Sequence, residues 1–152
     1  MNVKRRLRWD PKSAPTFWIN HASRLLMRHF EQRLRPLDLG MAYLPVVVAL
    51  EESGPLSQKR LAELAHVEQP TMAALLGRME RDGIISRQPH PTDKRATQIF
   101  FSAKGKACLP EAKEQLFEVA EQALSGLSKQ ERLLLLELLR RVVSNLDPNV
   151  AE

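Results

Sequence analysis

The side chains best suited to chemistry lie in a charged loop at residues 89–96, and the chemistry they suit is phosphate binding. This loop carries Lys94 and Arg95 between two segments, 84–88 and 97–101, whose β-branched and aromatic residues predict strands. Proline interrupts a hydrogen-bonded ladder, so the two prolines of the loop indicate that it protrudes beyond the strands. A protruding basic loop on a hairpin is typical of the wing of a nucleic-acid-binding domain.

A short helix precedes the hairpin and has the build of a helix that reads nucleic acid. We expect it to begin at Pro70, because proline tolerates the first helical position, and to end at Gly83. Its apolar face is formed by residues at helical spacing: Met72, Leu75, Leu76 and Met79. Small, polar and basic residues are left for the other sides: Thr71, Ala73, Ala74, Gly77, Arg78 and Arg81.

A shorter helix at 58–65 comes just before it, so the pair follows the helix-turn-helix plan. Ser57 is expected to cap this shorter helix, with Leu61 and Leu64 facing inward. Three residues should face outward at its N-terminus, where free backbone amides favour phosphate: Ser57, Gln58 and Lys59.

Polar residues at both ends of the second helix are candidates for contact with nucleic acid. Gln69 and Thr71 at its start can donate hydrogen bonds to phosphates or base edges. Arg78 has two open interpretations, because it could contact nucleic acid or pair with Asp82 or Glu80 on the same helix.

Longer helices are expected on both sides of this unit, and a helix at 41–52 follows Gly40. The first long helix should be capped by Thr16 and end before Pro36. Its apolar residues spread over more than one stripe, which indicates contact on two sides. Ser102 should cap a helix to about Ser125, with a bend or restart at Pro110.

The last helix is too apolar for the surface of a monomer. It begins with a Ser128-x-x-Glu131 capping box and continues to about Leu146. Its apolar residues cover every side: Leu133, Leu134, Leu135, Leu136, Leu138, Leu139, Val142, Val143 and Leu146. In a chain of 152 residues, a partner is expected to cover the second face.

Composition limits the remaining functions. Lys and Arg number 23 against 18 Asp and Glu, so the net charge of +5 mildly favours an anionic partner. Cys108 is the only cysteine, which fits a reducing, cytoplasmic location. Residues 1–15 are basic and rich in proline but lack the apolar core of a secretory signal, and no apolar run has the roughly 20 residues of a membrane span.

Catalysis and metal binding are not expected. The histidines lack the i, i+4 spacing of a metal site, and the chain carries no nucleophile motif, phosphate loop or persuasive carboxylate pair. We therefore expect no enzyme activity, no metal and no cofactor.

Five segments of the chain stand in a characteristic order and spacing: residues 61–65 (LAELA), 69–71 (QPT), 76–87, 93–95 (DKR) and 102–105 (SAKG). With these segments the middle of the chain resembles the MarR (multiple antibiotic resistance regulator) family of winged helix-turn-helix transcriptional regulators. The flanking helices also stand where the family has its dimerisation helices, so the resemblance covers about residues 16–146.

The resemblance implies a mainly α fold with a small β-hairpin wing and three parts. These are a basic, flexible arm at 1–15, a winged helix-turn-helix DNA-binding lobe at 37–101, and a helical dimerisation region at 16–36 and 102–147. It further implies a homodimeric, sequence-specific regulator of double-stranded DNA that acts on a pseudo-palindromic operator, and many members of the family are repressors. Many members are released by a small aromatic or phenolic ligand. Winged helices also serve as protein–protein interaction modules without DNA binding, and this alternative stays open.

By the same resemblance, Arg95 would reach into the minor groove and Asp93 would position the wing. Family members often have serine and then a basic residue where this chain has Ala73 and Ala74. Because alanine offers only apolar contact, recognition should depend more on Gln69, Thr71 and the wing.

A ligand site is less well defined by the sequence. Trp18, His21, Arg24 and Met27 could line an effector pocket at the dimer interface, although ordinary interface packing is the favoured interpretation. Cys108 could sense oxidants, but its position in the fifth helix favours a structural thiol.

Overall fold

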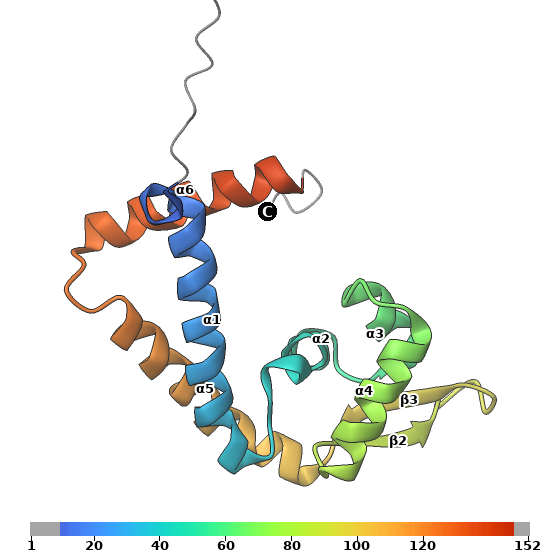
Figure 1. Ribbon diagram of the computed structural model, residues 1–152. Helices are drawn as coiled ribbons and strands as arrows, with labels where there is room; N and C mark the ends of the chain where they lie inside the picture. Colours follow the sequence, from blue (N-terminus) through green and yellow to red (C-terminus); the bar gives the residue numbers. More distant parts are fainter. Residues whose placement is uncertain (1–9, 148–152) are drawn as a thin grey trace, which may run out of the picture.

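The computed structural model describes residues 10–147, which fold into a winged lobe and a helical region (Figure 1). The helices are α1 Pro15–Leu34, α2 Leu44–Ser53, α3 Gln58–Leu64, α4 Gln69–Arg81, α5 Ala103–Ala123 and α6 Lys129–Leu146. The strands are β1 Leu56–Ser57, β2 Ile85–Pro89 and β3 Thr97–Phe101. Short 3-10 turns occupy Pro11–Ser13, Arg35–Leu37 and Met41–Tyr43.

The two regions share one hydrophobic core at their junction and extend in different directions from it (Figure 1). Helices α1 and α5 lie side by side, and α6 crosses the end of α1 far from α3 and α4 (Figure 1). Arg33 of α1 ties the first pair together by donating to Gln115 and Glu118 of α5. The mainly α winged helix-turn-helix fold expected from the sequence is confirmed.

Serine side chains begin three of the helices, as predicted. Ser57 accepts a hydrogen bond from the amide of Arg60, and Ser102 accepts one from the amide of Gly105. Ser128 forms a full capping box with Glu131. The cap expected at Thr16 is wrong, because α1 already begins at Pro15, whose missing N–H costs little in a first turn.

The core of the winged lobe forms around α4. The four residues of its predicted apolar face, Met72, Leu75, Leu76 and Met79, are all buried. Ile85 and Ile99 bring the hairpin onto the same core. Gly105 lets α5 approach closely, because a Cβ there would collide with the carbonyl oxygen of Ile84.

Three further expectations need correction. Helix α5 continues through Pro110 without a restart, with the adjacent Leu109 packed in the core. Leu64 is 41% exposed, because the inward residue one turn after Leu61 is Ala65. The sheet has a third strand, since the two residues of β1 pair with β3, which lies between β1 and β2.

Helix α6 contributes no buried residue to the described structure. Leu134 is 54% exposed and Leu146 is 82% exposed. None of the helices in residues 10–147 has the length and apolar character needed to cross a membrane. The exposed leucines of α6 therefore need another explanation.

Candidate nucleic-acid interface

The helix-turn-helix is held together by its turn and by polar contacts at its outer edge. Between α3 and α4 the chain reverses at His66, whose φ of 54° is left-handed. Gln58 at the start of α3 donates to Gln69 at the start of α4 over 3.5 Å. The structure thus brings together two of the predicted contact residues, and Lys59 is exposed beside them.

The outward face of α4 carries few polar groups. Thr71, Ala74 and Arg78 are exposed at i, i+3 and i+7, while Ala73 is half-buried at the edge of this face. Of the two alanines, Ala74 is therefore the one that stands at the centre of the surface. The helix offers hydrogen bonds near its two ends and an apolar contact between them.

The acidic neighbours of Arg78 are committed elsewhere. The carboxylate of Asp82 accepts a hydrogen bond of 2.6 Å from the hydroxyl of Tyr43. Glu80 forms an ion pair of 3.0 Å with Arg87 on β2. Across residues 10–147, Arg78 has no ion pair with either acid, which leaves its guanidinium available to a ligand.

The wing presents Lys94 and Arg95 to solvent. The amide of His90 donates to the carbonyl of Ala96 over 2.8 Å and closes the loop. Asp93 shapes the turn before Arg95, because its carboxylate accepts the Arg95 amide at 3.0 Å. The acid thus engages the backbone of Arg95 rather than its guanidinium.

His90 is a wing residue that sequence reasoning missed, having considered it only as a metal ligand. Its Nδ1 accepts hydrogen bonds from the amides of Thr92 at 3.2 Å and Asp93 at 3.3 Å. This role needs Nδ1 without a proton. In an Asx turn, a side chain accepts hydrogen bonds from amides two or three residues later, as His90 does here. The position of His90 two residues before Thr92 was the sequence signal for this role.

The four residues considered for an effector pocket lie along α1. Trp18 and His21 contact edge to face with ring centroids 6.2 Å apart, and Arg24 reaches His21 at 3.4 Å. The indole of Trp18 also donates to the carbonyl of Lys12, which anchors the turn at Pro11–Ser13. Residues 1–9 of the predicted basic arm lie outside the described residues.

Two clefts lie elsewhere, at the junction of the helical region and the winged lobe. The larger has a volume of about 350 Å³ and is lined by charged and polar side chains: Glu31, Arg35, Asp38, Tyr43, Arg78 and Asp82. The smaller, of about 90 Å³, is mainly apolar and lies between α2 and α5. Neither is lined by Trp18, His21, Arg24 or Met27.

Two titratable groups border this junction, of which Tyr43 is buried and Cys108 is half-buried. Burial, followed by the hydrogen bond to Asp82, raises the pKa of Tyr43 to about 12. Burial also raises the pKa of the Cys108 thiol, which donates to the carbonyl of Gly105. A raised pKa lowers the thiolate fraction, which favours a structural role for Cys108.

Comparison with known proteins places this geometry in context. Residues 41–97 match the model of the MarR family. A probable transcriptional regulator from Pseudomonas aeruginosa is 28% identical, with a TM-score of 0.73 over 88% of this chain and 99% of its own. The transcriptional regulator SlyA is also 28% identical, with a TM-score of 0.70 over 87% and 93%. The transcriptional repressor CouR, solved with a 23-mer DNA duplex, is 22% identical, with a TM-score of 0.74 over 87% and 94%.

Proposed function

Because residues 41–97 of this chain are a MarR-family winged helix-turn-helix, we propose that the protein is a sequence-specific regulator that binds double-stranded DNA. The observation that carries the proposal is the pairing, in one lobe, of an exposed face on α4 with an exposed basic wing. Within residues 10–147, neither Arg78 nor Arg95 forms an ion pair with the acids beside it, which bind other groups. CouR, which shares this fold, was solved on a DNA duplex.

In this proposal α4 enters the major groove. Gln69 and Thr71 donate to phosphates or base edges, Ala74 offers an apolar contact such as that with a thymine methyl, and Arg95 enters the adjacent minor groove. Around them, the amides at the start of α3 face the phosphate backbone, with Ser57, Gln58 and Lys59 beside them. Asp93 fixes the turn that carries Arg95.

The proposed active form is a homodimer built through α1, α5 and α6. The exposed leucines of α6 support it, because water-exposed apolar area of this extent is unfavourable in a lone chain. Two-fold symmetry would present two α4 helices to half-sites about 34–36 Å apart on a pseudo-palindromic operator.

The proposed sign of regulation is repression, and CouR is likewise a transcriptional repressor. We further propose that a small aromatic or phenolic ligand releases this protein from DNA. The larger junction cleft is better placed for such a ligand than Trp18 and His21, because Arg78 of α4 and its cap Asp82 line it. Titrating phenolic acids into the protein–DNA complex tests release. No change in DNA affinity at saturating ligand would reject it.

Selection of bound DNA from a random library tests the central proposal, and a palindromic consensus is expected. Arg95→Ala should then weaken binding and reduce the log–log salt slope by about 0.9 for each subunit. Lys106→Ala is the charge-matched control, because Lys106 is exposed on α5 outside the α4 and wing surface. Equal behaviour of the two variants would remove the wing from the interface. No DNA binding even at low salt, with a stable protein partner recovered, would favour the interaction-module alternative.

A further inference from the structure

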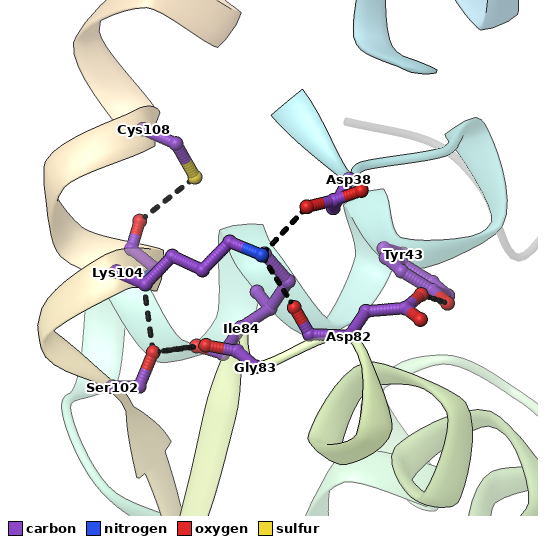
Figure 2. A network of polar contacts seen from close by, with 9 residues as sticks. Asp38, Tyr43, Asp82, Gly83, Ile84, Ser102, Lys104 and Cys108 are labelled. Carbon is purple, nitrogen blue, oxygen red and sulfur yellow. Dashed lines mark hydrogen bonds and ion pairs between the residues drawn. The ribbon is translucent and has the colours of Figure 1, made fainter. Parts of the chain in front are cut away.

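Lys104 joins three segments that are distant in the sequence. Its Nζ donates to the carboxylate of Asp38 at 2.6 Å and to the main-chain carbonyl of Asp82 at 2.8 Å (Figure 2). Asp38 ends the turn that follows α1, Asp82 is the C-terminal cap of α4, and Lys104 is in the first turn of α5. One ammonium group therefore connects the helical region to the end of the proposed recognition helix.

Asp82 is held from a second side as well. Its carboxylate accepts the hydrogen bond from Tyr43, which is buried just before α2. The next residues are fixed too, since Ser102 donates to the carbonyls of Gly83 and Ile84 (Figure 2). The C-terminal end of α4 is thus clamped, whereas its N-terminal end, with Gln69 and Thr71, is exposed.

A small rotation at this clamp becomes a large shift at the other end of the helix. Helix α4 has 13 residues, which gives it a length of about 20 Å. A tilt of about 10° at Asp82 would move the start of α4 by about 3 Å, which is close to one base-pair step. In a symmetric dimer both recognition helices would shift, so the distance between the half-sites they read would change.

We propose that Lys104, Asp38, Asp82 and Tyr43 form a joint that sets the angle of α4 against the dimerisation helices and thereby the half-site spacing that the dimer selects. These are positioning residues that act through α4. The inference rests on the proposed function, because it assigns the operator geometry of that same DNA-binding surface.

The joint can be opened without unfolding the protein. The Lys104–Asp38 pair lies at the surface, where ion pairs add little to global stability. A matched control exists on the same helix, since Lys113 of α5 pairs with Glu51 of α2 over the same distance of 2.6 Å, with its side chain similarly exposed. That second pair does not touch the end of α4.

The test measures affinity for a set of operators in which two copies of the selected half-site are separated by spacers that differ by single base pairs. Wild type and Lys113→Met should share one sharp optimum. Lys104→Met should lose about three- to tenfold in affinity at that optimum and broaden or shift it by one base pair. Its affinity for a single half-site should stay within about twofold. Lys104→Arg, which keeps a cation, should restore the optimum.

A spacing profile of Lys104→Met that matches Lys113→Met would overturn the inference and leave the proposed function intact. Wild-type protein that binds none of the operators would overturn both. If Lys104→Met is less stable than wild type, Asp38→Asn serves instead, because it removes the charge of the ion pair and leaves the tie to the Asp82 carbonyl. An unchanged profile for a folded Asp38→Asn would also count against the joint.

Discussion

The winged lobe and helix α6 differ in how far their apolar side chains are buried. The lobe buries its own apolar residues, so that Met72, Leu76 and Met79 are completely shielded within one chain. Helix α6 is far richer in leucine than the lobe but buries none of its leucines among the described residues. Its polar attachments are concentrated at its start, where Arg132 binds Glu121 and the carbonyls of Leu124 and Leu127. The lobe is thus structurally complete in one chain, whereas α6 needs a second surface.

The largest expected effect is on dimer affinity, when exposed leucines of α6 are replaced by a charged residue. Replacing Leu134 and Leu138 together with glutamate removes four leucines from the proposed symmetric dimer. Each buried leucine contributes roughly 1.5–3 kcal/mol. The dissociation constant of the dimer should therefore rise by at least about a thousandfold, as measured by analytical ultracentrifugation.

The control is Val48→Glu, which places a single glutamate on an exposed apolar residue of α2 in the other region. It should leave the dimer intact. Dimers of normal stability in the double variant would show that this row of α6 faces solvent or another protein.

Sequence patterns predicted the parts of the molecule that depend on near neighbours. The period of α4 identified its buried face, and the S-x-x-E pattern identified the cap at Ser128, because both act within a few residues. The joint at Lys104 was invisible for the opposite reason, since its partner Asp38 is 66 positions away. Strand β1 was missed because two residues are too few to show alternation.

The turn at the tip of the wing is held by contacts within one chain, and His90 makes two of them. His90→Leu removes the acceptor for the amides of Thr92 and Asp93, so the turn before Arg95 should loosen. The loss of about 1 kcal/mol should weaken DNA binding about fivefold. The salt slope should stay unchanged in fluorescence anisotropy, because no lysine or arginine is removed.

His90→Asn is the matched variant, because an asparagine oxygen can accept the same amides in an Asx turn. It should bind DNA nearly as well as wild type. If asparagine and leucine at this position weaken binding equally, the acceptor role of His90 is wrong.

The smallest expected effect lies where the two regions meet, at Tyr43. Tyr43→Phe keeps the ring and removes the hydrogen bond to Asp82, at a cost of about 1 kcal/mol in the free energy of unfolding. The folded pKa of Tyr43, about 12, is above its ordinary value of 10.0, so folding favours the protonated phenol. Its stabilising contribution should be complete below pH 10 and be lost as the pH rises toward 12.

Urea unfolding of the wild-type protein and Tyr43→Phe over a range of pH measures this contribution. The wild-type advantage should be constant near neutral pH and shrink above pH 10. An advantage that grows with alkalinity would show that the phenol is not held protonated at this junction.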